Sequence, residues 1–352
     1  MNDPDIFRAT PRQIKAATID IMSVGLVPFI QSSPGMGKST IVRGIAQEFN
    51  LELKDHRLST SAPEDLSGLP RFDENGFARF APFADLFPIE STPLPEGKDG
   101  WLLFLDEFNS ARKEVQAAAY KLILDYEVGQ FKLHPRVKIV CAGNLMSDRA
   151  FVNALSTAMQ SRVVNLEMKI SHSEWMEDVA LKNKYDMRII TYLSQYPGKL
   201  MDFKPDHTEK TFCCPRTWEF ANKIISTEPS KKMIKPERNF VYGGTITSGV
   251  ATDFIQFTNV FESLVNIAEV LASPTDCRMP DDRNAKWATI GHLMEHTDTD
   301  NFSMVVEYVN RFEMTFRVLY FRGLLIQQPV LHGHAAFRAG MLALNQYLNG
   351  PT

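Results

Sequence analysis

Apolar residues in the first half of the chain fall into short continuous runs separated by helical patterns. The runs at residues 27–30, 101–105 and 137–142 are each short enough to be a strand buried on both faces. Between them, residues 39–49 and 111–126 have the spacing of amphipathic helices. Because strands alternate with helices, the pattern predicts an α/β fold built around a mainly parallel sheet.

Three further segments are predicted in the same half. Thr10 followed by Pro11 is a typical helix start, with a capping hydroxyl before a proline at the first helical position. Residues 51–58 alternate between apolar and polar side chains and predict a second strand. Residues 71–100 are rich in Pro, Phe and Gly, which predicts a long loop with a hairpin around Asn75-Gly76.

Beyond about residue 170 the strand patterns fade. Helical periods dominate there, for example over residues 254–271 and 302–325. We therefore expect an α/β domain over residues 1–170 and a mostly helical domain over residues 171–352.

The segment VPFIQSSPGMGKST, residues 27–40, joins the first buried strand to a helix through a glycine-rich turn. Glycines let successive N–H groups point at one anion, and the helix dipole and a lysine add positive charge. The segment matches the phosphate-loop pattern G-x-x-x-x-G-K-[ST], except that Ser32 replaces the first glycine, which we expect to lower nucleotide affinity. The predicted phosphate-binding residues are Ser33, Pro34, Gly35, Met36, Gly37, Lys38, Ser39 and Thr40. An ordinary glycine turn before a helix is the less favoured interpretation, because a second motif also points to a nucleotide.

That second motif is WLLFLDEFN, residues 101–109, in which a buried strand ends in two carboxylates. Ligands of α/β proteins bind at the carboxyl edge of the sheet, where this pair emerges. Asp106 and the Ser39 hydroxyl are expected to hold Mg²⁺, and Glu107 to polarise the water that attacks the γ-phosphate. The alternative is a strand that simply ends in solvated acids, which the nearby phosphate loop makes less favoured.

Composition limits the classes of protein that fit. With 44% hydrophobic and 23% charged residues, the chain has the make-up of a soluble globular protein, and its net charge of -4 gives no electrostatic footprint for nucleic acid. The acidic start MNDPDIF is unlike a secretory signal, and no apolar run is long enough to span a membrane, so we expect a cytoplasmic protein. The cysteines form no C-x-x-C pair and are expected to be reduced: Cys141, Cys213, Cys214 and Cys277.

Taken together, the motifs resemble those of AAA+ ATPases. The phosphate loop is similar to Walker A, the strand ending in Asp106 and Glu107 to Walker B, and VKIVCAGN, which ends in Asn144, to sensor 1. Three segments resemble the MoxR branch of that family: SAPEDLSGLP (61–70), DEFNSARKEVQAAAY (106–120), and LSTAMQSRVV (155–164), which is similar to the branch's finger-bearing helix. CPRTWE (214–219) resembles the sensor 2 segment at the start of the family's helical lid, and the overall length is similar to that of bacterial and phage members of the branch. The resemblance covers about residues 10–225.

The resemblance implies roles for three further residues. Asn144 would orient the attacking water, Arg162 would be the arginine finger, and Arg216 would be the sensor 2 arginine that couples the nucleotide to the lid. Asn144 could instead cap a loop, each arginine could pair with a carboxylate, and Arg149 is a competing finger candidate. Val163 follows Arg162 where the family usually has Phe, which affects only packing.

The same resemblance implies an AAA+ P-loop NTPase with a three-layer αβα core, a helical lid and a C-terminal helical extension. It implies a homo-oligomeric, hexameric ring that hydrolyses ATP with Mg²⁺ and, like a chaperone, remodels or activates another protein. The implied partner has a von Willebrand factor A domain, and the implied location is the cytoplasm of a bacterium or a phage-infected host. Two alternatives stay open: a nucleic-acid motor or loader on the same core, and a scaffold that nucleotide organises with little turnover.

One further motif does not belong to the set that resembles AAA+ ATPases. HLMEH, residues 292–296, fits the pattern H-x-x-E-H, in which two histidines of one helix face bind zinc and a glutamate acts as base. A pattern with three fixed positions arises readily by chance, and the sequence shows no third ligand. We therefore expect no metallopeptidase and no stoichiometric zinc.

Overall fold

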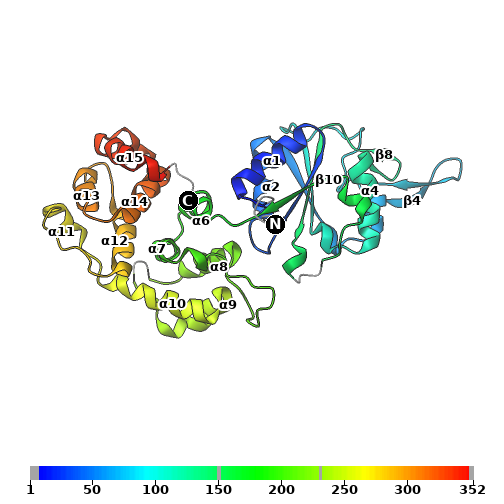
Figure 1. Ribbon diagram of the computed structural model, residues 1–352. Coiled ribbons are helices and arrows are strands. Elements are labelled where there is room, and N and C mark those ends of the chain that lie inside the picture. Colours follow the sequence, from blue (N-terminus) through cyan, green and yellow to red (C-terminus); the bar gives the residue numbers. More distant parts are fainter. Residues whose placement is uncertain (1–7, 149–151, 230–231, 349–352) are drawn as a thin grey trace, which may run out of the picture. The chain divides into compact units, whose positions relative to one another are not determined.

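A six-stranded parallel sheet organises the first part of the computed structural model, which describes residues 8–148, 152–229 and 232–348 (Figure 1). Its strands lie in the order β1-β10-β2-β9-β6-β3. Their bounds are β1 (Arg8–Ala9), β2 (Val27–Ser32), β3 (Leu51–Arg57), β6 (Gly100–Asp106), β9 (Val137–Asn144) and β10 (Val163–Met168). The expected α/β class is confirmed, and the predicted strands 27–30, 51–58, 101–105 and 137–142 are all present.

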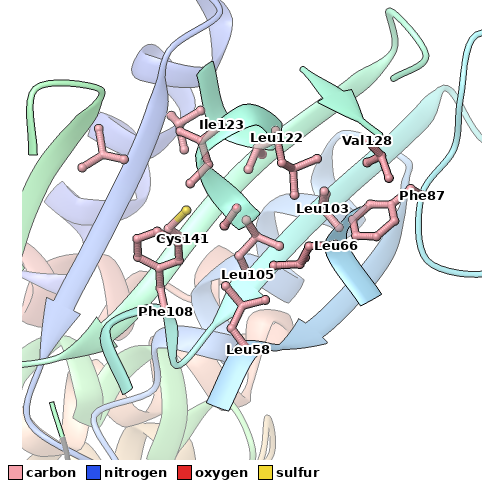
Figure 2. Close-up of a cluster of buried hydrophobic side chains, with 14 of the residues drawn as sticks. Leu58, Leu66, Phe87, Leu103, Leu105, Phe108, Leu122, Ile123, Val128 and Cys141 are labelled. Carbon is pink, nitrogen blue, oxygen red and sulfur yellow. The ribbon is translucent and has the colours of Figure 1, made fainter. Parts of the chain in front are cut away.

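Helices cover both faces of this sheet. On one face lie α1 (Pro11–Ser23) and α2 (Lys38–Glu48), and on the other lie α3 (Pro63–Ser67) and α4 (Lys113–Asp125) (Figure 1). Leu103 and Leu105 of β6 pack with Leu122 and Ile123 of α4 in one buried cluster (Figure 2). The intervening Leu102 and Phe104 point to the opposite face, because side chains alternate along a strand. Burial on both faces explains why β6 is a continuous apolar run.

Helix α1 begins where the sequence predicts. The Thr10 side chain accepts a hydrogen bond from the Gln13 backbone N–H, and Gln13 Oε1 accepts one from the Thr10 N–H at 2.9 Å. This reciprocal capping satisfies two N–H groups that the helix leaves without a partner. The buried residues of α1 are Ile14, Thr18 and Met22, which face the sheet.

The edge beyond β2 contains a strand that the sequence does not predict. The segment 155–164 is expected as a helix, but only α5 (Thr157–Gln160) is helical, and β10 begins at Val163 and pairs with Val27 of β2. Polar residues such as Asn165 interrupt β10, and only its first and last residues are buried. Its apolar pattern is therefore too weak to indicate a strand.

The segment between β3 and β6 contains the predicted hairpin, formed by β4 (Leu69–Phe72) and β5 (Ala78–Ala81). Asp73 Oδ1 accepts hydrogen bonds from the N–H groups of Asn75 and Phe77, each at 3.0 Å, and Gly76 has a φ of 80°. These are the features of an Asx-stabilised turn. A second, shorter hairpin follows α4 and consists of β7 (Glu127–Val128) and β8 (Phe131–Lys132).

The chain divides into two compact units: the first runs to Ile170 and includes Lys204–His207, and the second comprises Ser171–Phe203 and the chain from Thr208 onward. In the described part of the second unit every regular element is helical. Its main helices are α6 (His172–Trp175), the π-helix η5 (Met176–Leu181), α7 (Met187–Gln195), α8 (Pro215–Ile225), α9 (Asn239–Ile246), α10 (Ser248–Thr258), α11 (Ile267–Ala272), α12 (Arg283–His296), α13 (Phe302–Val309), α14 (Met314–Gln327) and α15 (Ala335–Leu348). Within the described ranges, no helix is both long and apolar enough to cross a membrane.

Two long helices expected in this unit are each interrupted. The stretch 254–271 contains the end of α10, a 3-10 turn η8 (Asn259–Glu262) and the separate helix α11, whose N-cap Asn266 accepts a hydrogen bond from the Ala268 N–H at 3.0 Å. The stretch 302–325 is broken between α13 and α14. Polar capping residues stop a helix even where the apolar spacing continues.

Candidate functional site

The turn between β2 and α2 has the backbone of an anion-binding loop. Gly35 and Gly37 have φ values of 76° and 93°, in the left-handed region that residues with a Cβ rarely adopt. Helix α2 begins without a side-chain cap, so the N–H groups of its first turn have no acceptor from a capping side chain. These N–H groups and the helix dipole favour an anion at this position.

Ser32 fits the loop in place of the usual glycine. Among the described residues with positive φ, the loop contributes only Gly35 and Gly37, so the backbone at Ser32 does not require glycine. The buried Ser32 hydroxyl donates to the Ser33 carbonyl at 3.0 Å and accepts from Lys38 Nζ at 3.0 Å. The serine therefore contacts the amino group that is expected to bind phosphate.

The Lys38 ammonium joins the loop to the neighbouring strand β9. Lys38 Nζ donates to the Ser32 carbonyl at 3.1 Å and to Asn144 Oδ1 at 3.2 Å. Ser32 and Asn144 are register partners at the ends of β2 and β9. The parallel sheet thus brings together Lys38 and Asn144, which are far apart in sequence.

The predicted metal ligands also lie together. Asp106 ends β6, and its Oδ2 accepts a hydrogen bond from the Ser39 hydroxyl at 3.2 Å. Its Oδ1 accepts one from the Glu107 N–H at 2.8 Å. Burial raises the pKa of the Asp106 carboxyl, and the hydrogen bond from Glu107 and the charge of Lys38 oppose that rise. A divalent cation beside Asp106 and Ser39 would compensate the cost of burying this carboxylate.

Glu107 is held by residues at the end of β3. Its backbone has a φ of 54°, which is unusual for a residue other than glycine. One carboxylate oxygen accepts a hydrogen bond from the Ser59 hydroxyl, and the other lies 3.6 Å from Arg57 Nε. Neither Ser59 nor Arg57 is predicted from the sequence as a site residue. Their only signal in the sequence is their position: Arg57 is the last residue of a strand of the same parallel sheet, and Ser59 follows it at the carboxyl edge.

A reciprocal amide contact fixes the end of β9. Asn109 Nδ2 donates to the Asn144 carbonyl at 2.7 Å, and the Asn144 N–H donates to Asn109 Oδ1 at 3.1 Å. A Cβ at Gly143 would lie 2.2 Å from Asn109 Oδ1, so this close approach requires glycine. Asn109 and Gly143 are therefore positioning residues for Asn144. The sequence does not indicate this role for either of them.

Among the predicted arginines, Arg162 contacts residues outside this cluster. Arg162 lies against α4, with its guanidinium carbon 4.6 Å from the Tyr120 ring centre and its Nη1 2.5 Å from the Ala158 carbonyl. Arg149 lies outside the described residues. Arg216 belongs to the second unit, where it is exposed in the first turn of α8.

Comparisons with known proteins find only distant structural matches. No protein-family model matches the chain, and no curated protein matches its sequence. Two matching solved structures come from one bacterial protein. The Holliday junction branch migration motor RuvB of Thermotoga maritima is 15% identical over 85% of this chain and 85% of that chain, with a TM-score of 0.36. A single-residue mutant of that protein is 15% identical over 75% and 76% of the two chains, with a TM-score of 0.37. These likenesses are distant, so the functional argument rests on the geometry of the site itself.

Proposed function

We propose that this chain is an AAA+-type ATPase that binds ATP with Mg²⁺ and hydrolyses the γ-phosphate bond. The observation that carries the proposal is the convergence of Lys38, Ser39, Asp106 and Asn144 on the glycine turn at one sheet edge. A cation, a metal-ligand pair and an uncharged amide around an anion-binding turn are the parts that phosphoryl transfer requires.

The residues around the turn suit a magnesium nucleotide. The N–H groups at the start of α2, with Gly35 and Gly37, would surround the β- and γ-phosphates, and Lys38 would turn from the Ser32 carbonyl toward them. The Ser39 hydroxyl and the Asp106 carboxylate would hold Mg²⁺, which neutralises charge on the phosphate oxygens. Ser33, Pro34, Met36 and Thr40 complete the proposed phosphate-binding set.

Glu107 is the proposed general base and Asn144 the residue that orients the attacking water. Ser59 and Arg57 hold the Glu107 carboxylate at the end of β3. Glu107 would have to leave these two partners to accept a proton from a water beside the γ-phosphate. We therefore propose a resting state in which the Glu107 carboxylate is paired with Ser59 and Arg57.

The finer assignment rests on the sequence resemblance. We propose a MoxR-type protein that forms a homo-oligomeric, hexameric ring in the cytoplasm of a bacterium or phage-infected host, without membrane attachment. In such a ring Arg162 would act as the arginine finger and Arg216 as sensor 2. The proposed client is a protein with a von Willebrand factor A domain, which the ring would remodel or activate.

Phosphate release from ATP, measured with the full chain, tests the proposed reaction. We expect turnover that requires Mg²⁺ and rises when the correct client protein is added. Chelation of Mg²⁺ should stop phosphate release, since Asp106 and Ser39 would then present no metal to the phosphates.

The same assay distinguishes the alternatives. Tight ATP binding with no phosphate release under any condition would contradict the ATPase and favour a nucleotide-organised scaffold. Turnover stimulated by DNA and not by a client protein would contradict the MoxR-type assignment and favour a nucleic-acid motor.

A further inference from the structure

A cluster of three possible metal ligands lies on α12, in the helical unit. His292, Glu295 and His296 each offer one ligand atom, and these atoms lie within 4.8 Å of one another. The spacing i, i+3 and i+4 puts the three side chains on one face of the helix. The two imidazole ring centres are 4.3 Å apart. The cluster is thus gathered closely enough for one small ion to reach all three side chains.

The hydrogen bond of His296 determines which of its ring nitrogens can bind a metal. Its Nδ1 lies 2.8 Å from the His292 backbone carbonyl. Because a carbonyl can only accept, Nδ1 carries the proton and Nε2 keeps its lone pair in the neutral ring. Histidines that bind metals commonly donate their other ring N–H to a carbonyl or carboxylate, which fixes the ring orientation. His296 is therefore oriented as a metal ligand would be.

The backbone that carries the cluster is held rigidly. Leu293 and Met294, between the ligands in sequence, are each only 1% exposed. Thr297 Oγ1 donates to the Leu293 carbonyl at 2.6 Å, and Asn301 Nδ2 donates to the His296 carbonyl at 2.8 Å. A buried helix face with a fixed C-terminal end lowers the entropy lost when the ligands are ordered by an ion.

Glu262, from a distant part of the sequence, lies in the wall of the cavity beside the two histidines. A cavity of about 400 Å³ is lined by both histidines and by Glu262, the last residue of the 3-10 turn η8. His292 and His296 are half-buried, whereas Glu295 and Glu262 are exposed, so an ion can enter from solvent. Leu264 and Ile267 add apolar walls to the same cavity. The motif alone could not indicate Glu262, because the fold and not the helix spacing brings it to this cavity.

We propose that His292, Glu295 and His296, together with Glu262, form a Zn²⁺ site that links α12 to the segment between η8 and α11. Two imidazoles and two carboxylates make a ligand set that suits Zn²⁺ in tetrahedral geometry. Both carboxylates serve as ligands, so the site is structural and not that of a metallopeptidase. This proposal departs from the expectation from sequence that no stoichiometric zinc binds, and it is independent of the proposed ATPase activity.

Metal titration of the tag-free full chain, after treatment with chelator, tests this site. Co²⁺ serves as the spectroscopic probe, because its visible absorption distinguishes tetrahedral from octahedral coordination, and Zn²⁺ is then added as competitor. We expect one equivalent of tetrahedral Co²⁺ that Zn²⁺ displaces, and a rise in the melting temperature with Zn²⁺, since an ion that binds only the folded state stabilises it.

Substitutions of the proposed ligands test which side chains bind the ion. His292→Ala combined with His296→Ala should weaken binding by at least ~10-fold and remove the effect of Zn²⁺ on melting. Glu262→Gln should weaken binding and change the Co²⁺ spectrum. His207→Ala is the matched control, because it removes an exposed histidine of the loop before α8 and should leave binding unchanged. Circular dichroism in chelator checks that each variant folds, and Glu295→Gln replaces the double variant if that one does not.

Three results would overturn the proposal. A wild-type chain that binds no stoichiometric Co²⁺ or Zn²⁺ would exclude the site. Binding that persists unchanged in a folded double variant would place the ion elsewhere. A Glu262→Gln variant that binds as tightly as the wild type would exclude the link between α12 and the segment 262–267.

Discussion

At the scale of single residues, Glu107 is the side chain on which hydrolysis depends most. Glu107→Gln removes the proposed base but leaves Lys38, Ser39 and Asp106 to hold the nucleotide. We expect ATP binding to persist while phosphate release falls by ~10²-fold or more. Binding by calorimetry and turnover by phosphate release are the two measurements.

Glu114→Gln, on the exposed first turn of α4, is the control and should change neither. Normal turnover in Glu107→Gln would mean that another group activates the water.

Ser59 tests whether the contact at the end of β3 restrains the base. The Ser59 hydroxyl donates a hydrogen bond to Glu107, beside the ion pair of Glu107 with Arg57. Ser59→Ala removes this donor, so Glu107 should leave its resting position more readily, and we expect client-free turnover to rise by about 2- to 10-fold, the equivalent of one hydrogen bond. A variant in which turnover instead falls with unchanged ATP binding would show that Ser59 assists the reaction.

Asp106 links the site to stability. Burial raises the pKa of its carboxyl in the folded chain, so the folded state binds this proton more tightly than the unfolded state does. The ionised carboxylate therefore destabilises the nucleotide-free fold above that pKa, and the destabilisation disappears as the pH falls below it. Asp106→Asn should raise the melting temperature at neutral pH without Mg²⁺, and the gain should shrink toward acid pH. Asp125→Asn, which is exposed, should show no such gain, and a lower melting temperature for Asp106→Asn at neutral pH would contradict the argument.

At the scale of elements, the close approach of β9 to the segment after β6 positions Asn144. Gly143→Ala would put a Cβ 2.2 Å from Asn109 Oδ1, so we expect a loss of stability of about 1–3 kcal/mol together with weaker turnover. Denaturant unfolding measures the first effect. Gly44→Ala is the matched control: a Cβ there meets nothing within 4 Å, and alanine in a helix should stabilise by up to about 1 kcal/mol. Equal effects of the two substitutions would exclude a special role for Gly143.

Elements with a strong apolar pattern could be predicted from the sequence, and weakly patterned ones could not. The run in β6 is buried at every position, so it indicates a strand by itself. In β10 only Val163 and Met168 are buried, and its pairing with β2 depends on tertiary contacts. The helix break near Asn266 likewise involves a local side-chain cap, which the spacing of apolar residues does not indicate.

The same distinction applies to the candidate site. The phosphate loop and Asp106 each lie within a contiguous segment, so their roles as phosphate-binding and metal-binding groups can be predicted from the sequence. The contact of Glu107 with Ser59 and Arg57 is not, because it depends on β3 being the neighbour of β6 in the sheet. Sequence order places these two strands apart, and only the topology brings their ends together.

At the scale of the whole molecule, the proposed ring makes a prediction about Arg162. In one chain this guanidinium lies over Tyr120 of α4, outside the cluster around Lys38. A finger supplied to a neighbouring subunit is worth ~10³- to 10⁵-fold in turnover. Arg162→Ala should therefore spare ATP binding and nearly abolish phosphate release. Tyr120→Leu removes the ring and keeps the guanidinium, so a much smaller effect of Tyr120→Leu separates a finger from a packing residue.

Mixing two inactive variants tests whether the finger acts between subunits. An Arg162→Ala chain keeps Lys38 and Glu107, and a Glu107→Gln chain keeps Arg162. Mixed rings would contain some interfaces with an intact site and an intact finger, so partial recovery of turnover is expected. If mixed rings form and no activity returns, Arg162 does not act in trans, and Arg149 becomes the candidate to test.

Nucleotide titration of Lys38→Ala decides whether the turn before α2 binds the phosphates of ATP. This substitution removes the ammonium that lies between the loop and Asn144. Calorimetric titration with ATP and Mg²⁺ should show binding to the wild type and to Lys113→Ala, an exposed lysine of α4, and no measurable binding to Lys38→Ala. Unchanged ATP affinity in a folded Lys38→Ala chain would mean that the turn before α2 does not bind the phosphates.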